Sequence, residues 1–207
     1  MLSLQTVYPD TMELLKRLMR LPILGQMRLV GGTALALQYG HRRSVDLDFF
    51  GHTTEDVDEL TQYLSNSIDE VVRHSCTKRI KAYMLNGIKV DIVNYDYPWI
   101  GDPIIEDGIR LASDMDIAAM KVNAIGRGTK KDFIDVYFLL RHFSFEDLLK
   151  LYQKKYQDGS EYRALLSMTY FIDADPQPMP FMFEDVDWET IKSTIRKEVE
   201  DYTQSHN

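Results

Sequence analysis

The sequence predicts an α+β fold, in which a small mixed β-sheet is flanked by helices and followed by a helical C-terminal region. Short β-prone apolar runs crowd the first hundred residues, and Asn86-Gly87 between two of them is the strongest hairpin signal. From Ser113 onward, apolar residues recur at the three- and four-residue spacing of helices. The chain has 207 residues, enough for one moderate domain with a helical extension. We therefore expect a sheet-bearing core over residues 1–110 and a helical region over residues 111–207.

The elements of the first half follow from apolar spacing and from turn residues. Pro22 and Gly25 end the first helix, and Gly31-Gly32 bends the first strand into a short helix. The elements expected here are helix 12–19, strand 27–30, a short helix after the glycines, strand 45–50, helix 53–65, and strands 70–75, 79–85 and 88–93.

The second half begins with residues 95–108, which we interpret as an irregular connector because they contain Pro98, Gly101 and Pro103. Helical spacing then dominates, interrupted by the proline-rich residues 173–180. The helices expected here are 113–125, 129–140, 145–156, 160–171 and 188–202.

Composition narrows the possible functions. The net charge of −8 disfavours broad affinity for nucleic acid, which depends on neutralising phosphates, but it allows a local basic groove. A single cysteine, Cys76, excludes an intramolecular disulfide and suits a reducing cytosol. The first ten residues lack a signal-peptide pattern, and no apolar run approaches the length of a membrane span. We expect a cytoplasmic protein with no membrane partner. The basic clusters that could converge are Arg42-Arg43, Lys78-Arg79 with Lys81, and Arg127 with Lys130-Lys131.

Two carboxylates stand one residue apart in the expected strand 45–50. Side chains alternate faces along a strand, so Asp46 and Asp48 project to one side. The same spacing recurs elsewhere in this acidic chain, but these two lie in an apolar run where unpaired charge is costly. The Gly31-Gly32 turn beside them can present backbone N–H groups. The combination predicts a site for a divalent metal and phosphate.

A third carboxylate, Asp91, lies in the middle of the expected strand 88–93. Ile88, Val90 and Ile92 share one face of that strand, and Asp91 lies on the other. It is either a strand residue on a solvated face or the third acidic residue of the site, on a strand adjacent to 45–50.

The segments Gly31-Gly32-Thr33 and 40–50 together resemble the first motif of the polymerase-β-type nucleotidyltransferase superfamily. The similarity is greatest to the abortive-infection AbiEii/AbiGii family, the toxin half of bacterial toxin–antitoxin pairs. It covers roughly the first two thirds of the chain. The resemblance implies a polymerase-β-like nucleotidyltransferase fold and a third carboxylate on a later strand of the same sheet.

The resemblance also implies an enzyme that moves a nucleoside monophosphate from a nucleoside triphosphate to an acceptor. Two Mg²⁺ ions, or Mn²⁺ in their place, would stabilise the attacking and leaving oxygens. Lys121 would contact the phosphates, although a lysine in an apolar helix can also extend to solvent. Residues 130–140 resemble the last motif of the family, which implies that Lys131, Asp132 or Asp135 lines the site, with Asp135 as the first choice. An i,i+4 ion pair between Lys131 and Asp135 is the alternative. The expected site residues are Asp46, Asp48 and Asp91 as metal ligands and catalytic groups, and Gly31, Gly32, Thr33, Arg43, Lys121 and Asp135 around the nucleotide.

The acceptor cannot be derived from the residues themselves. The resemblance implies RNA, in particular the 3′ end of tRNA, and a cognate antitoxin protein as partner. Two alternatives stay open: a small-molecule acceptor, as in the antibiotic nucleotidyltransferases, and a nucleotide-binding module without chemistry. The third carboxylate separates them in part, since metal chemistry needs Asp91 and a binding module does not.

Overall fold

The computed structural model describes residues 1–206; Asn207, the last residue of the expected C-terminal region, lies outside the described residues. Its strands form one seven-stranded mixed sheet in the order β3-β4-β5-β2-β1-β7-β6. This confirms the α+β prediction. The strands are β1 (Arg28–Val30), β2 (Leu47–Gly51), β3 (Val71–Cys76), β4 (Ile80–Leu85), β5 (Ile88–Asn94), β6 (Ile104–Glu106) and β7 (Ile109–Leu111).

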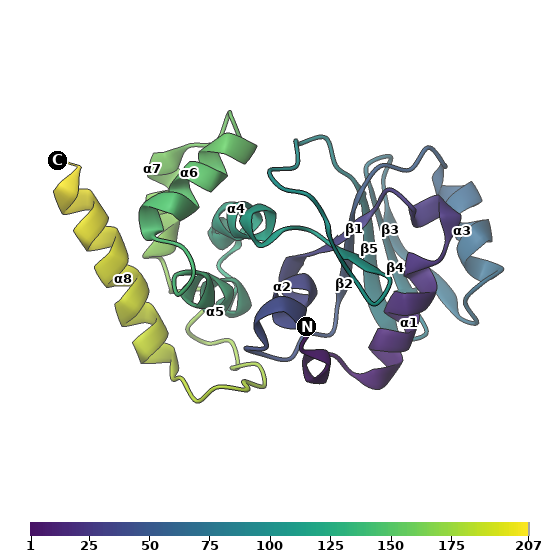
Figure 1. Ribbon diagram of the computed structural model, residues 1–207, viewed down its shortest axis with the longest axis horizontal. Helices are drawn as coiled ribbons and strands as arrows, with labels where there is room; N and C mark the ends of the chain where they lie inside the picture. The colour runs from purple at the N-terminus through teal and green to yellow at the C-terminus, as the bar shows by residue number, and fades with distance from the viewer. Residues whose placement is uncertain (207) are drawn as a thin grey trace.

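Helices cover both faces of this sheet. Figure 1 shows α1 and α3 on one side, α2 and α4 on the other, and α5 to α8 beyond α4, with α8 farthest from the sheet. The α-helices are α1 (Pro9–Met19), α2 (Gly31–Tyr39), α3 (Val57–Ser65), α4 (Asp114–Ala124), α5 (Lys130–Leu139), α6 (Phe145–Lys155), α7 (Glu161–Met168) and α8 (Trp188–Ser205). Three single turns of 3₁₀ helix complete the fold: η1 (Leu4–Thr6), η2 (Pro22–Leu24) and η3 (Ile125–Arg127). No helix within residues 1–206 is long and apolar enough to cross a membrane.

The register at the centre of the sheet follows from the apolar pattern of β2 and β5. These strands are parallel, and Leu47 pairs with Val90 while Phe49 pairs with Ile92. All four side chains are fully buried. Because a shift by one residue would move this apolar set to the opposite face, the register is strongly specified. The intervening residues therefore share the other face of the sheet.

The prediction of an irregular connector over residues 95–108 is wrong for its C-terminal part. Ile104–Glu106 and Ile109–Leu111 form the β6–β7 hairpin, and β7 then pairs in parallel with β1. Asp107 and Gly108 both have positive φ, 51° and 77°. An Asp-Gly pair with these angles makes the two-residue turn that favours a hairpin. Pro98, Gly101 and Pro103 precede this turn, and they led to the interpretation of the whole segment as irregular.

Candidate active site

Two carboxylates lie side by side on the α4 side of the sheet, and a third lies close in sequence to one of them. Asp48 on β2 pairs in register with Asp91 on β5, so their side chains lie next to each other on one face. Asp46, two residues before Asp48, precedes β2 rather than lying within it. Burial, and then the neighbouring charge of Asp91, raise the pKa of Asp48 to about 6. Asp46 adds to the same repulsion. The cluster is thus short of positive charge.

The oxygen atoms of Asp91 are only partly satisfied. Oδ2 lies 3.0 Å from Lys89 Nζ, whereas Oδ1 is buried and accepts no hydrogen bond within residues 1–206. Carboxylate oxygens are the donors that Mg²⁺ prefers. No three His, Cys, Asp or Glu side chains in the described part of the chain already surround a common metal position. The donor set fits a hard divalent cation, and Asp91 Oδ1 can bind one while Oδ2 keeps its ion pair with Lys89.

The diglycine turn lies against this cluster. Gly31 has a φ of 68°, and a Cβ there would stand 2.4 Å from Asp48 Oδ2. A Cβ on Gly32 would stand 2.3 Å from Arg42 Nη2. No side chain caps the N-terminus of α2. The first backbone N–H groups of α2 have no partner inside the helix, and they point out of the N-terminus, where helices bind anions. A side chain at either glycine would therefore have to displace Asp48 or Arg42, and at Gly31 the positive φ also favours glycine.

Thr33 does not fit the phosphate-binding role expected for its hydroxyl. The side chain is buried, its Oγ1 donates to the backbone carbonyl of Asp46, and it lies 2.8 Å from Ser44 Oγ. The hydroxyl is occupied by these two contacts because α2 packs against the segment that leads into β2. Thr33 instead fixes the position of Asp46.

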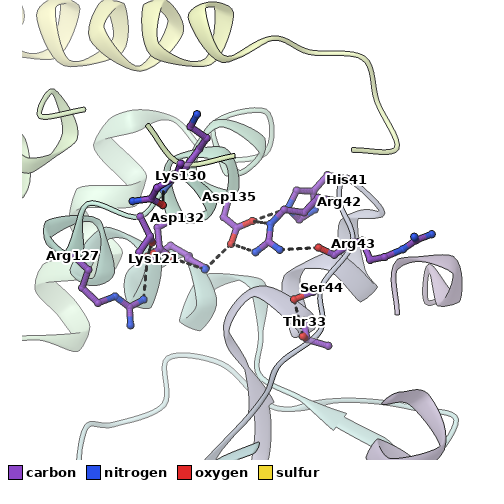
Figure 2. A network of polar contacts seen from close by, with 12 residues as sticks. Thr33, His41, Arg42, Arg43, Ser44, Lys121, Arg127, Lys130, Asp132 and Asp135 are labelled. Carbon is purple, nitrogen blue, oxygen red and sulfur yellow. Dashed lines mark hydrogen bonds and ion pairs between the residues drawn. The ribbon is translucent and has the colours of Figure 1, made fainter. Parts of the chain in front are cut away.

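A buried charge network connects this site to the C-terminal helices (Figure 2). Asp135 on α5 is completely buried and accepts two hydrogen bonds from Arg42, from Nε at 2.7 Å and Nη2 at 2.8 Å. Its Oδ1 also lies 2.8 Å from His41 Nε2, and its Oδ2 lies 2.6 Å from Lys121 Nζ. Burial alone would raise the pKa of Asp135, but the charges of Arg42 and Lys121 hold it well below its usual range. Asp135 is therefore ionised.

Lys121 connects the network to the carboxylates. Its Nζ lies 2.7 Å from Asp132, which also pairs with Arg127 at 3.1 Å. Burial would lower the pKa of Lys121, but Asp135 and Asp132 raise it, so the ammonium stays charged. Its charge also lowers the pKa of Asp48, against the upward effect of burial. Lys121 is thus a fixed cation beside the acidic cluster.

Arg43 points away from the network in Figure 2. Its guanidinium lies 4.7 Å from the ring centroid of Tyr8 and 4.4 Å from that of Phe181. The expectation that Arg43 neutralises phosphate charge is not supported by this placement, because the preceding residue, Arg42, turns inward instead. The backbone at Arg43 is held there by a hydrogen bond from its N–H to the carbonyl of Phe181.

Two residues of the network, His41 and Arg42, were missed as site residues from the sequence, whereas Asp132 was one of three candidates that the resemblance placed at the site. One signal could have found Arg42, since a glycine at position 32 leaves room for a long side chain close to the turn. Asp135 was expected beside the nucleotide. In the structure it lies behind Lys121 and is buried by the side chains of His41, Arg42 and Lys121.

A cavity of about 360 Å³ runs from the acidic cluster along α4. Gly31, Asp48 and Lys121 line one part of it, and aromatic side chains of the segment after β5 line another. Asp46, Asp91, Arg43 and Asp135 do not line it. The remaining lining residues are Val30, Phe50, Tyr95, Tyr97, Ile117, Met120, Asn123, Ala124, Arg127 and Tyr156.

The chain is similar to known proteins both in sequence and in structure. An Aquifex aeolicus (strain VF5) protein, the uncharacterized aq_aa25, is 35% identical over 203 residues, covering 93% of this chain and 96% of the relative. The crystal structure of an H. pylori protein assigned as a nucleotidyltransferase superposes with a TM-score of 0.60 at 20% identity, covering 96% of each chain. MenT4, the nucleotidyltransferase toxin Rv2826c of Mycobacterium tuberculosis H37Rv, superposes with a TM-score of 0.55 at 16% identity, covering 89% of this chain and 80% of MenT4.

The two structural likenesses establish the fold, which is that of the nucleotidyltransferases. The sequence profile of the family described as nucleotidyl transferase AbiEii toxin, type IV toxin–antitoxin system, matches residues 13–205. The match extends through α8 and so includes the sheet, the acidic cluster and the C-terminal helices. The chain belongs to the AbiEii nucleotidyltransferase family of toxins.

Proposed function

We propose that this toxin nucleotidyltransferase transfers a nucleoside monophosphate from a nucleoside triphosphate to RNA, with the 3′ end of tRNA as the acceptor, in a reaction that depends on Mg²⁺. The observation that carries the proposal is the pairing of Asp48 with Asp91 against the Gly31 turn. Two adjacent carboxylates, one of which has its pKa raised by burial and by the other, are stabilised by a divalent cation.

Each group has a distinct task in this proposal. Asp46, Asp48 and Asp91 hold the cations, which when bound supply electrostatic stabilisation to the attacking and leaving oxygens. Asp91 also takes the proton of the attacking hydroxyl. The N–H groups of Gly31 and Gly32 bind phosphate oxygens at the start of α2. Asp46 is assigned its task because the hydrogen bond from Thr33 to its carbonyl holds it next to β2. Gly32 is assigned its task because it lies in the first turn of α2.

Lys121 offsets the negative charge that develops on the leaving pyrophosphate. It lines the cavity with Asp48, and its ammonium is held in place by Asp132 and Asp135. A cation whose position is fixed before the reaction loses no free energy to reorganisation in the transition state. In this proposal, residues 1–110 supply the metal and phosphate ligands, and residues 111–206 supply the ammonium group of Lys121.

A small-molecule acceptor is the second candidate, and one observation favours it. Each of the three basic clusters of the sequence has one member in the interior: Arg42, Lys81 and Lys130 are all buried. Lys81 Nζ donates to the carbonyl of Glu55, and Lys130 Nζ to that of Asp175. The net charge of −8 also disfavours binding of an RNA backbone.

The test is Mg²⁺-dependent incorporation of label from each of the four nucleoside triphosphates, with tRNA and total RNA as acceptors. Label in tRNA that disappears with EDTA and with Asp48→Asn supports the proposal, provided that the variant unfolds cooperatively. Label only in small molecules would move the assignment to the second candidate. Nucleotide binding with no transfer to any acceptor would contradict the enzyme assignment and favour a binding module.

The family is the toxin half of a type IV toxin–antitoxin system, so a cognate antitoxin belongs to the same system. Expression of the chain without the antitoxin is expected to arrest bacterial growth. Asp48→Asn is expected to relieve that arrest, because toxicity in this proposal comes from the transfer reaction. Arrest by the inactive variant would separate toxicity from the chemistry.

A further inference from the structure

A second cavity, of about 380 Å³, adjoins the first on the side of the C-terminal helices. The two cavities share three lining residues: Tyr97, Asn123 and Tyr156. We call these three the shared wall. Beyond it, α6, α7 and the turn between them line the second cavity, which therefore lies farther from Asp48 than the first.

The shared wall presents a fixed aromatic surface. Tyr97 is 43% exposed, and its ring packs edge-on against Tyr156 at 4.7 Å between centroids. Tyr95 lies behind it at 5.4 Å and exchanges a hydrogen bond of 2.9 Å with the Tyr156 hydroxyl. Pro98, which follows Tyr97, is anchored by Lys155, whose Nζ donates to the Pro98 carbonyl at 2.9 Å. An exposed ring held in one position loses little entropy when a flat ligand stacks on it.

Polar groups without partners stand around this aromatic surface. Asn123 on α4 is exposed, and its side-chain amide makes no hydrogen bond within residues 1–206. The guanidinium of Arg163 on α7 likewise forms neither an ion pair nor a hydrogen bond in the described chain. Asp158 lines the same cavity. An amide, a guanidinium and a carboxylate together offer the donors and acceptors that read the edge of a nucleobase.

We propose that the shared wall binds the nucleobase of the incoming nucleoside triphosphate, that Tyr97 stacks on it, and that Asn123 and Arg163 determine which base is accepted. The inference rests on the proposed function and adds the specificity determinant to it. The first cavity joins the phosphate-binding end, at Gly31 and Lys121, directly to the shared wall. A nucleotide with its phosphates at one end has only one flat group to place at the other, which is its base.

The same chemistry could serve a base of the acceptor strand. The continuity of the first cavity favours the incoming nucleotide, because its phosphates and its base must both be bound by one connected site. An acceptor base would instead need to reach the shared wall past the triphosphate. The experiment below separates the two sources.

The experiment measures binding of the four nonhydrolysable nucleoside triphosphates and of inorganic tripolyphosphate to the full-length protein by calorimetry in Mg²⁺. Tyr97→Ala should weaken the preferred nucleotide at least tenfold and leave tripolyphosphate unchanged. Tyr97→Phe should retain most of the nucleotide affinity, because it keeps the ring. Asn123→Ala and Arg163→Ala should change the ranking of the four nucleotides by threefold or more. Tyr63→Ala, at an exposed tyrosine on α3, is the matched control and should change neither ligand.

The outcomes are separable. If the wild type binds tripolyphosphate as tightly as every nucleotide, no base site exists, although the transfer reaction can stand. If Tyr97→Ala weakens both ligands equally, the wall shapes the phosphate site and the inference is overturned. If Tyr97→Ala leaves nucleotide binding intact and raises KM for RNA alone, the wall holds the acceptor base, which also overturns the inference. If the wild type binds neither ligand, the proposed function falls together with it.

Discussion

The substitution Asp135→Asn distinguishes a positioning role from direct contact with substrate. In the structure this carboxylate is fully buried and is contacted by Arg42, His41 and Lys121 at 2.6–2.8 Å. Asparagine keeps the shape but removes the charge. The cationic groups of Arg42 and Lys121 then stay buried without the carboxylate that both contact.

The expected loss of stability is large. Removing one partner of a buried ion pair costs about 3–5 kcal/mol, because the other charge is left uncompensated. For a domain of this size, each kcal/mol lowers Tm by roughly 2–4 °C, so Asp135→Asn should lower Tm by roughly 6–20 °C. The pKa of Asp135 is depressed in the folded protein. Its stabilising contribution is therefore complete above the unfolded pKa of about 4 and is lost as the pH falls through the folded pKa.

The assay is urea and thermal unfolding at pH 7, with transfer activity measured at a temperature where the variant is folded. Glu146→Gln, which removes one partner of an exposed i,i+4 pair with Lys150, is the control and should leave Tm close to that of the wild type. The reasoning is refuted if Asp135→Asn unfolds within about 1 kcal/mol of the wild type but has lost transfer. In that case the carboxylate acts on the substrate.

Three further substitutions test the site. The pKa of Asp48 is raised in the folded protein to about 6, so between about pH 4 and 6 the folded state binds more protons and stability falls as the pH rises. Asp48→Asn should therefore stabilise the metal-free protein at pH 7 by about 1–3 kcal/mol. The same substitution should abolish transfer and remove the rise in Tm on adding Mg²⁺. Gly31→Ala should reduce transfer at least a hundredfold, since its Cβ would stand 2.4 Å from Asp48, whereas Gly87→Asn, at a position that also has positive φ but no neighbour within 4 Å, should retain it. Arg43→Ala should change kcat less than threefold, because its guanidinium lies on Tyr8; a loss comparable to that of Asp48→Asn would show that it moves to the substrate.

Much of the fold could be predicted because its signals are local. The Asn86-Gly87 turn and the alternation of Ile88, Val90 and Ile92 specify both a hairpin and the buried face of β5. The helical region after Ser113 follows from apolar spacing. The residue that caps α4 is Ser113, whose side chain accepts a hydrogen bond from the N–H of Asp116. The β6–β7 hairpin was missed because its strands have three residues each, too short for alternation to be detected.

The candidate site was only partly accessible to the same reasoning. Adjacent placement of Asp48 and Asp91 could be expected, because both lie at polar positions of otherwise apolar strands. The roles of Arg42 and Arg43 could not be distinguished, since neighbouring residues in a loop have no periodicity that predicts which one is buried. Lys121 was recognised as an unusual charge in an apolar helix, and Asp135 was chosen from the family resemblance. Their partners could not be predicted, because they lie about eleven to ninety residues away in sequence.

The buried network gives these distant residues a common physical purpose. Asp135 on α5 fixes Arg42, and a Cβ on Gly32 would displace the guanidinium of Arg42 from this position. On the other side Asp135 fixes Lys121, which adjoins Asp48 in the cavity. One carboxylate from the helical region thus positions both the turn and the cation that flank the acidic cluster. A loss of Asp135 should therefore lower transfer through two displaced groups at once, and a double substitution with Arg42 should be less damaging than the sum of the single ones.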